Sequence, residues 1–232
     1  MQRQMDIIAN NIANMNTVAY KRESIMFNEY LTETGGSLPE SFQKVSFVQE
    51  MGVARQMSNG ELQITGNPLD TAIEGEGMFK VRKVDGDIAY TRNGHFALSG
   101  ENTLVTTDGH ELLDEGDAAI QFPVNANGFK IAEDGTVSAE DVGQIGKIAV
   151  HQFQNYGAMR KIGDNLYSAE EEPIPSENFK LTQGMLETSN VSPVLEITNM
   201  IQLSRAYAQT ANLLDQVQQT QSQAINKITR FA

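Results

Sequence analysis

The residues of this chain that could perform acid–base or metal chemistry are few and widely separated. Its three histidines are His95, His110 and His151, and none of them stands in an HExxH or similar metal-binding spacing. The chain has no cysteine, which excludes disulfides, thiol nucleophiles and Cys-based metal sites. It also has no GxSxG nucleophile elbow. We therefore interpret the histidines as solvent-facing or turn residues and predict no catalytic residue.

Two short motifs resemble parts of ligand-binding loops. Gly75-Glu76-Gly77 lacks the third glycine and the following helix of a dinucleotide loop. Asp114-Glu115-Gly116-Asp117 is acidic enough to attract calcium weakly but does not match an EF-hand loop. We interpret both as turns and predict no cofactor and no metal site. A hydrolase whose carboxylates converge in a pocket is an alternative, although 30 acidic residues produce carboxylate pairs by chance.

The net charge of −13 is placed unevenly along the 232 residues. Residues 1–30 and residues 184–232 each sum to zero, so all of the excess negative charge lies in residues 31–183. An acidic middle argues against nucleic-acid binding, which needs clusters of Lys and Arg. Neutral ends suit burial in a homopolymer, where like charges would otherwise repel each other. The simpler interpretation, which is favoured and is compatible with neutral ends buried in a homopolymer, is that the middle has a solvated acidic surface.

The sequence also indicates whether the chain could insert into or be exported across a membrane. No stretch of about 18 uninterrupted apolar residues exists, so we predict no membrane insertion. The first residues lack the basic region, apolar core and cleavage site of a secretory signal. Any export of this chain is therefore expected to use another route.

The N-terminal stretch from Asp6 to Lys21 has helical spacing. One helix face is predicted to carry apolar residues spaced 3, 4 and 3 apart, and these are Met5, Ile8, Ile12 and Met15. Four asparagines lie beside them, at Asn10, Asn11, Asn14 and Asn16. Asparagine is a poor helix former, so we expect its amides to bond to neighbouring chains or to cap the helix. The helix is predicted to end at Asn16-Thr17, before an extended segment.

The middle of the chain has the pattern of a β domain. Residues 22–61 lack a clean period and are expected to form extended chain with short strands and a loop at Thr34–Ser37. From Leu62 onwards, short alternating segments are separated by turn signals such as Asp85-Gly86 and Asp108-Gly109. This pattern predicts an antiparallel, Greek-key-like or small-barrel domain.

The C-terminal segment is predicted to be one long helix. Ser192 is a suitable N-cap and Pro193 a suitable first helical residue, and no Gly or Pro follows. The first apolar seam consists of Met200, Leu203, Tyr207, Leu214, Val217, Ala224 and Ile228. The second apolar seam consists of Val194, Ile197, Ile201, Ala208, Ala211 and Ile225. Since one partner helix needs one seam, two seams predict contacts on more than one side.

The predicted fold class is α+β, in which the N- and C-terminal helices pair as a coiled-coil-like element and carry a central antiparallel all-β domain. Five parts are expected: an N-terminal helix and extended segment (1–30), an irregular connector (31–61), the β domain (62–169), a linker and return segment (170–191) and the C-terminal helix (192–232).

Several segments together resemble the rod and hook family of flagellar axial proteins. The segments are Asp6–Asn14 with Asn16-Thr17 and Tyr20-Lys21, Thr65–Phe79, Tyr90–Phe96, Leu104–Gly109, Gln183–Val191, Met200-Ile201 and Arg205–Tyr207. Each segment alone is a weak sign of the family, but all of them in this order are specific to it. Together they lie at both ends and in the middle of the chain. The length and the single β domain are most similar to members of the proximal rod, and members of the distal rod are the near alternative.

The resemblance implies a structural subunit, not an enzyme. Such proteins are exported unfolded through the flagellar type III apparatus and polymerise helically in the periplasm around a channel. The terminal helices would form the inner tube, the β domain would lie outside, and the rod would pass motor torque to the hook. The expected partners are copies of this chain, other rod proteins and the export apparatus. An alternative of a different class is a soluble dimeric binding module with an acidic β domain.

The resemblance and the seams together predict the assembly residues. They are Met5, Ile8, Asn10, Asn11, Ile12, Asn14, Met15, Asn16, Tyr20, Asn190, Ile197, Met200, Ile201, Leu203, Arg205, Tyr207, Ala211, Leu214, Val217 and Ile228. Two departures from the family pattern stand out. Members usually begin several helical turns earlier, so we expect a shortened first helix here and weaker pairing. Ala19-Tyr20 stands where Gly-Phe is common, which keeps an aromatic ring but loses a flexible position.

Overall fold

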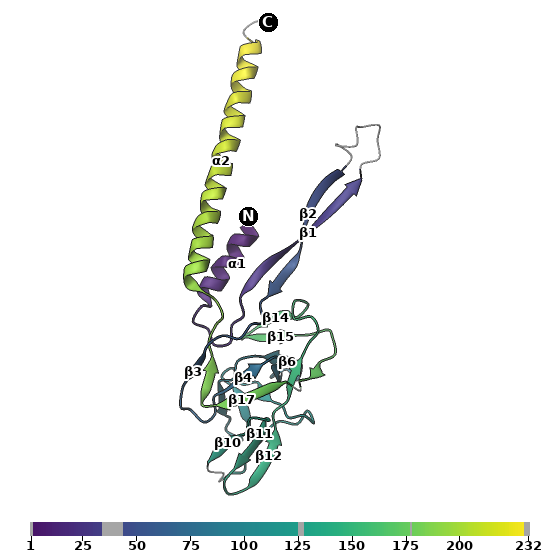
Figure 1. Ribbon diagram of the computed structural model, residues 1–232, viewed down its shortest axis with the longest axis vertical. Coiled ribbons are helices and arrows are strands. Elements are labelled where there is room, and N and C mark those ends of the chain that lie inside the picture. Colours follow the sequence, from purple (N-terminus) through teal and green to yellow (C-terminus); the bar gives the residue numbers. More distant parts are fainter. Residues whose placement is uncertain (1, 34–43, 125–127, 177, 230–232) are drawn as a thin grey trace. The chain divides into compact units, whose positions relative to one another are not determined.

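The computed structural model describes residues 2–33, 44–124, 128–176 and 178–229. The chain divides into two compact units (Figure 1). We call the first, Met1–Ala13 with Ser192–Ala232, the helical unit, and the second, Asn14–Val191, the β unit. The five boundaries expected from the sequence stay predictions, while the contacts separate the chain after Ala13 and after Val191.

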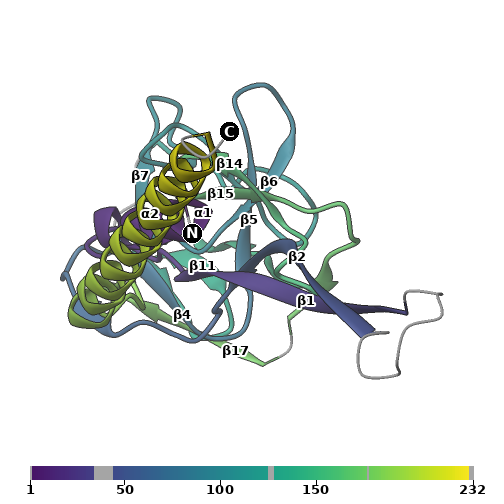
Figure 2. The ribbon, with the colours of Figure 1, turned by 90° about the horizontal axis from the view of Figure 1, so that it is seen from above.

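The helical unit contains α1 (Gln2–Ala13) and α2 (Pro193–Thr229), which lie side by side in both views (Figure 2). The start of α2 at Pro193 is as predicted, and its 37 residues correspond to a length of about 55 Å. Helix α1 ends at Ala13, earlier than the predicted Asn16-Thr17. The amide of Thr17 donates to the carbonyl of Asn14 at 3.1 Å, and the Thr17 hydroxyl donates to the Asn14 side chain at 3.2 Å. A local turn of this kind competes with the helix.

The β unit is built from short strands, and every described pair is antiparallel. The strands are β1 (Glu23–Glu33), β2 (Lys44–Arg55), β3 (Leu62–Ile64), β4 (Thr71–Gly75), β5 (Met78–Arg82), β6 (Ile88–Thr91), β7 (Phe96–Leu98), β8 (Leu104–Thr106), β9 (Glu111–Leu112), β10 (Phe129–Ile131), β11 (Thr136–Ala139), β12 (Gly143–Lys147), β13 (Val150–Gln152), β14 (Arg160–Gly163), β15 (Leu166–Ser168), β16 (Ile174–Pro175), β17 (Phe179–Gln183) and β18 (Met185–Glu187). The largest sheet has the order β14-β15-β6-β5-β9-β8-β7, with β13 on β5 and β16 on β13. A smaller sheet has the order β10-β11-β12, and the remaining pairs are β1-β2, β17-β4 and β18-β3.

The segment expected to be extended chain with short strands is instead one long hairpin. Strands β1 and β2 pair along their full length, from Glu23 opposite Arg55 to Glu33 opposite Lys44. A bulge between Met26 and Phe27 shifts the register, and Gly52 opposite Met26 has a φ of 148°. The irregular apolar spacing hid the pairing, because an extra residue at a bulge changes which side chains share a face. The predicted loop at Thr34–Ser37 lies outside the described residues.

The predicted acidic linker is partly a strand. Residues Ile174 and Pro175 form β16 on the edge of β13, a position where proline is tolerated. The next residue, Ser176, is buried. Its amide donates to the backbone carbonyl of Val150 at 2.9 Å, and its hydroxyl donates to the backbone carbonyl of Glu76 at 2.9 Å. Residues 170–176 therefore return the chain along the β unit and do not separate two domains.

The core of the β unit confirms the alternation predicted for β5. Phe79 and Val81 are fully buried, whereas Lys80 and Arg82 on the other face are partly exposed. The Phe79 and Phe96 rings meet edge to face, with centroids 5.2 Å apart. The predicted turns at Asp85-Gly86 and Asp108-Gly109 connect β5 to β6 and β8 to β9, and both glycines have positive φ.

Candidate functional site

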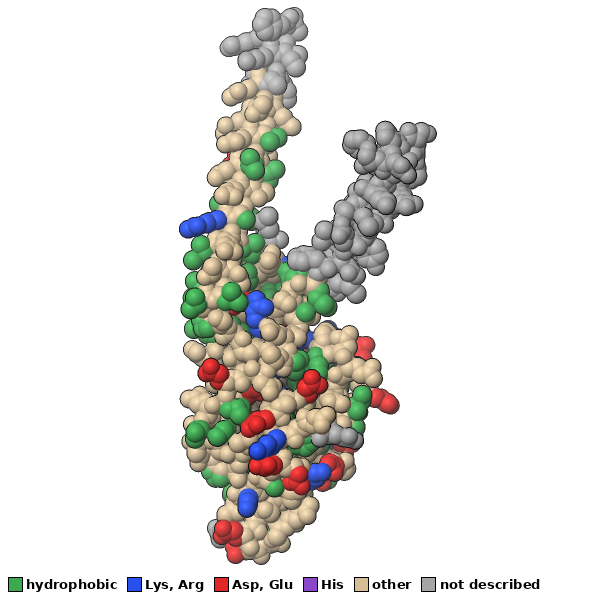
Figure 3. Space-filling view, viewed as in Figure 1, with side chains coloured by type: hydrophobic (Ala, Val, Ile, Leu, Met, Phe, Trp, Pro, Cys, Tyr) green, Lys and Arg blue, Asp and Glu red, His purple; other side chains and the backbone are tan. Residues whose placement is uncertain are grey.

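The two seams of α2 differ in burial. Of the first seam, Met200 and Leu203 are partly covered where α1 contacts α2. The second seam stays open: Val194 is 76 % exposed, Ile197 47 % and Ile201 48 %. Figure 3 shows hydrophobic side chains on the surface of α2. A single chain therefore leaves the described part of the second seam, from Val194 to Ala211, in contact with solvent.

The first seam is also open beyond the reach of α1. A helix of 12 residues is about 18 Å long, which is a third of the length of α2. Tyr207, Leu214 and Val217 are about half exposed, and the side chain of Ile228 lies outside the described residues. Arg205 and Ala211 are also exposed. Tyr207, Leu214 and Val217 therefore form an apolar surface of the first seam that the first helix of the same chain does not cover.

The buried stripe of α1 differs from the predicted face. Ile7, Ile8 and Asn11 are buried, whereas Met5 and Ile12 are partly buried. The spacing of 3, 4 and 3 residues does not include Ile7, because Ile7 is adjacent to Ile8 in the sequence. Asn10, within α1, is exposed; after the end of α1, Asn14 and Met15 are partly buried and Asn16 is exposed. The assembly role assigned to these residues stays a prediction.

One asparagine of α1 binds within the chain. The side-chain amide of Asn11 donates to the carboxyl of Glu196 at 3.3 Å, and both residues are fully buried. Glu196 lies in the first turn of α2, where a negative charge interacts favourably with the helix dipole. This contact gives part of the Asn-rich motif a role inside the subunit.

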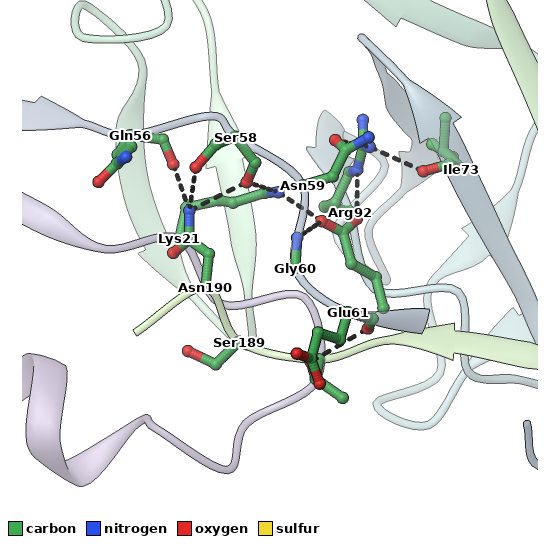
Figure 4. Close-up of polar contacts among 12 residues, drawn as sticks. Lys21, Gln56, Ser58, Asn59, Gly60, Glu61, Ile73, Arg92, Ser189 and Asn190 are labelled. Carbon is green, nitrogen blue, oxygen red and sulfur yellow. Dashed lines mark hydrogen bonds and ion pairs between the residues drawn. The ribbon is translucent and has the colours of Figure 1, made fainter. Parts of the chain in front are cut away.

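In the β unit, three charged side chains meet in a buried site that we call the Glu187 cluster, consisting of Lys21, Arg92 and Glu187. Figure 4 shows Lys21 and Arg92 of this cluster with Gly60 and the neighbouring polar residues. The ammonium group of Lys21 donates to Glu187 Oε1 at 2.6 Å, and Arg92 Nε donates to Glu187 Oε2 at 2.7 Å. The amide of Gly60 donates to Oε1 at 2.8 Å. Glu187 thus connects the segment after α1, the segment before β3 and the end of β6.

The other N–H groups of Lys21 and Arg92 donate hydrogen bonds to carbonyl groups. Lys21 Nζ donates to the carbonyl of Ser58 at 2.9 Å. Arg92 Nη2 donates to the carbonyls of Ile73 at 2.8 Å and Gly75 at 2.7 Å, and Nη1 donates to Gly77. A guanidinium group can donate five hydrogen bonds in a fixed plane. Arg92 uses this geometry to tie Glu187 to the backbone around β4.

The backbone beside the cluster is held in the same way. The amide of Ala19 donates to the carbonyl of Glu187 at 2.8 Å, and the side chain of Asn190 accepts from the amide of Arg22 at 2.7 Å. The Asn190 amide also donates to the carbonyls of Gln56 at 2.8 Å and Ser58 at 3.0 Å. The chain that leaves α1 and the chain that enters α2 are therefore fastened together within the β unit.

Ala19 and Tyr20, which the sequence analysis compared with the Gly-Phe of the family, lie next to these hydrogen bonds. Tyr20 is 1 % exposed, and the Lys161 ammonium lies 4.6 Å from the centre of its ring. The neighbouring Ala19 has a φ of 57°, a left-handed conformation that glycine adopts at lower cost. This geometry gives a physical reason why glycine suits the position that Ala19 occupies.

Burial and charge oppose each other in the Glu187 cluster. Burial raises the pKa of the Glu187 carboxyl, but the charges of Arg92 and Lys21 outweigh burial, so its pKa lies below its ordinary value. Burial lowers the pKa of the Lys21 ammonium, and the attraction of Glu187 offsets only part of that effect. Two cations around one carboxylate leave the cluster with one excess positive charge.

The cluster is not evident from the sequence, although its members lie in the segments that carry the family resemblance. Lys21, Arg92 and Glu187 stand in Tyr20-Lys21, Tyr90–Phe96 and Gln183–Val191. A charged residue inside each of three otherwise uncharged or apolar motifs was the available signal. The pairing itself was hidden, because the partners are separated by 166 and 95 residues.

Two of the residues with possible chemistry, His95 and Asp114, have structural partners. His95 Nδ1 lies 2.6 Å from the buried Asp70 carboxyl. His151 lies in β13, not in a turn, and burial lowers its pKa. The carboxyl of Asp114 accepts the amides of Gly116 and Ala118, each at 2.8 Å. Across the described residues, no group of three His, Cys, Asp or Glu side chains could hold a metal ion.

The fold therefore defines a class of protein in which an antiparallel β unit fastens together the two chain segments that continue into terminal helices. Residues 1–21 match the family described as "Flagella basal body rod protein". Residues 72–139 match "Flagellar hook protein FlgE/F/G D1 domain", and residues 182–227 match "Flagellar basal body rod FlgEFG protein C-terminal". In the described ranges, no helix has both the length and the apolar character needed to cross a membrane.

Whole-chain relatives agree with these matches. The chain is 36 % identical to the flagellar basal-body rod protein FlgF of Caulobacter vibrioides over 233 residues, covering 100 % of this chain and 94 % of the relative. It is 34 % identical to FlgG of Bacillus subtilis, covering 92 % of this chain and 89 % of the relative. It is 31 % identical to FlgF of Mesorhizobium japonicum, covering 98 % and 92 %. The chain belongs to the flagellar basal-body rod protein family.

Family membership settles the class of activity. The relatives are structural proteins of the flagellar rod, and the chain is not an enzyme. The hydrolase alternative raised by the abundant carboxylates is therefore wrong.

Proposed function

We propose that this chain is a subunit of the proximal rod that self-assembles helically through its terminal helices. The observation that carries the proposal is the open second seam of α2, formed in its described part by Val194, Ile197, Ile201, Ala208 and Ala211. Exposed apolar surface of this extent on a neutral helix is typical of a surface that another protein covers. A copy of the same chain offers the same seam and a matching neutral surface.

The proposed assembly uses the two units differently. Helices α1 and α2 pair in a coiled-coil-like manner, pack against neighbouring copies and line the export channel. The β unit, which carries the acidic excess of residues 31–183, faces water. Within the β unit, the Glu187 cluster joins the two segments that continue into the helices, and we propose that torque on the helices passes through these segments into the subunit.

The proposed site of action is the rod in the periplasm. The chain is exported through the flagellar type III apparatus and meets copies of itself and other rod subunits there. Proximal placement rests on the likeness to FlgF of Caulobacter vibrioides along the full chain. Distal placement is the second candidate, because FlgG of Bacillus subtilis is similar at 34 % identity.

Substitution of the second seam tests the assembly proposal. We expect Ile197→Gln/Ile201→Gln to abolish incorporation into basal bodies and motility while the purified monomer keeps its melting temperature, because both side chains are about half exposed. The matched control is Leu195→Gln/Leu213→Gln, which removes two exposed apolar side chains outside both seams. Equal incorporation of the seam variant and the control would refute the proposal.

The position along the rod needs a separate measurement. A density map of the intact basal body with this chain labelled at Gly100, an exposed glycine with open space around its Cα, would locate it. We expect label near the base of the rod. Label along the distal part would favour the second candidate.

A further inference from the structure

Among the buried residues described in α1, Asn11 is the polar one, and it pairs with Glu196 of α2. Asn11 lies in the last turn of α1, Glu196 lies in the first turn of α2, and neither is exposed to solvent. The Asn11 amide donates to Glu196 Oε2 at 3.3 Å. The other buried residues of α1 are Ile7 and Ile8. Because the end of α1 meets the start of α2, the two helices run antiparallel past this pair.

An apolar stripe alone does not define a register. Shifting one helix by a turn, about 5.4 Å, replaces one set of apolar contacts by another set of similar area. A buried polar pair responds differently, because the same shift separates donor from acceptor and leaves both without their partner in an apolar contact. A single buried polar residue is known to fix register in helix pairs in this way.

We propose that the Asn11–Glu196 pair fixes the register of α1 on α2 and holds α1 against the face of α2 that carries Glu196. With Glu196 directed at α1, Met200 and Leu203 follow on the same stripe, three to four residues apart. Ile197 lies about 100° around the helix from Glu196, so the second seam cannot also face α1. The assignment of the open seam to a second copy rests on the proposed function, whereas the register itself is a property of the single chain.

The register can be measured by disulfide cross-linking, since the chain has no cysteine of its own. In an antiparallel pair that matches Asn11 with Glu196, Ile8 lies opposite Met200, and a shift of one turn places Ile8 opposite Leu203. Two full-length proteins are needed, Ile8→Cys/Met200→Cys and Ile8→Cys/Leu203→Cys. Each is oxidised as a monomer at low concentration, and the intramolecular cross-link is quantified by mass spectrometry.

We expect the first cysteine pair to cross-link at least about tenfold more than the second, because a shifted register leaves the buried polar pair unsatisfied. Adding Asn11→Leu/Glu196→Leu to both proteins should bring the two yields close to each other while the helix content stays the same. The control Asn10→Leu/Gln202→Leu adds two leucines at exposed positions of the same helices and should keep the tenfold preference.

Two outcomes would overturn the proposal. An unchanged preference for the first pair in the Asn11→Leu/Glu196→Leu background would show that apolar packing sets the register. No preference in the unsubstituted background would show that the chain has no fixed register to set. Neither outcome depends on polymerisation; loss of rod incorporation with a normal cross-linking pattern would instead count against the proposed function.

Discussion

Glu187 is the residue on which the fastening of the two chain ends depends. Its carboxyl accepts from Lys21, Arg92 and the amide of Gly60, and all three distances are between 2.6 and 2.8 Å. The two cations share one anion, so the loss of Glu187 and the loss of Lys21 have different consequences. Removing the anion leaves two buried positive charges together, whereas removing Lys21 leaves a matched pair.

We therefore predict unequal costs for two substitutions in the cluster. Glu187→Gln should lower the free energy of unfolding by about 3–5 kcal/mol, the typical cost of leaving a buried charge unpaired. Lys21→Met should lower the free energy of unfolding clearly less, because Arg92 and the Gly60 amide still donate hydrogen bonds to both carboxyl oxygens of Glu187. Urea denaturation of the two purified variants measures both values. A larger cost for Lys21→Met would contradict this account of the cluster.

The lowered pKa of Glu187 predicts a dependence of stability on pH. A carboxyl whose pKa is lower in the folded state stabilises the fold above its unfolded-state pKa of about 4.3, and this contribution is lost as pH falls through the folded-state pKa. The difference in unfolding free energy between the wild type and Glu187→Gln should be constant near neutral pH and shrink below about pH 4.3. Thermal or urea denaturation between pH 7 and pH 3 measures it, and a difference that grows on acidification would refute the prediction.

At the scale of elements, β18 pairs with β3, and the backbones of Thr188 and Gly60 next to this pair lie very close together. The carbonyl oxygen of Thr188 would lie 1.9 Å from a Cβ placed on Gly60. The amide of Thr188 donates to Glu61 at 2.8 Å, so both backbones are held in place. The close approach explains why a glycine stands beside the Glu187 cluster.

Gly60→Ala should consequently destabilise the β unit by about 1–3 kcal/mol, the usual cost of forcing an extra methyl group into a packed site. The control is Gly100→Ala, since Gly100 has no neighbour within 4 Å of its Cβ position and no strained φ. The control should be neutral or slightly stabilising. Melting temperatures of the two variants decide the comparison, and equal temperatures would mean that the backbone at Gly60 moves easily.

At the scale of the whole molecule, the two units are separately compact, and each contains its own contacts. The buried core around Phe79, Phe96 and Leu104 and the Glu187 cluster lie entirely in the β unit. The open seams lie in the helical unit. The buried groups that stabilise the fold and the seams proposed for assembly thus lie in different parts of the chain.

Removal of residues 193–232 should separate these two properties. The truncated chain should keep a cooperative thermal transition and β-type circular dichroism, because β18 and the Glu187 cluster precede the deletion. It should lose incorporation into the rod, which basal-body purification and immunoblotting would detect. An unfolded truncated chain would show that the β unit depends on the helices.

Much of this protein follows from its sequence alone. The presence of both helices, the start of α2 at Pro193 and the hairpin turns at Gly86 and Gly109 were predictable, because each depends on interactions within a few residues. Membership of the rod family was predictable as well, since its motifs are read in order along the chain.

Only the tertiary structure decided how distant segments meet. The Glu187 cluster, the Asn11–Glu196 pair and the long β1-β2 hairpin join residues whose local sequence carries no sign of the partner; for Asn11 and Glu196 the separation is 185 residues. The choice of which seam of α2 is covered also belongs here, because both seams are equally apolar in sequence and the contact with α1 distinguishes them. Periodicity identifies which faces are apolar, and packing alone determines which of those faces are buried.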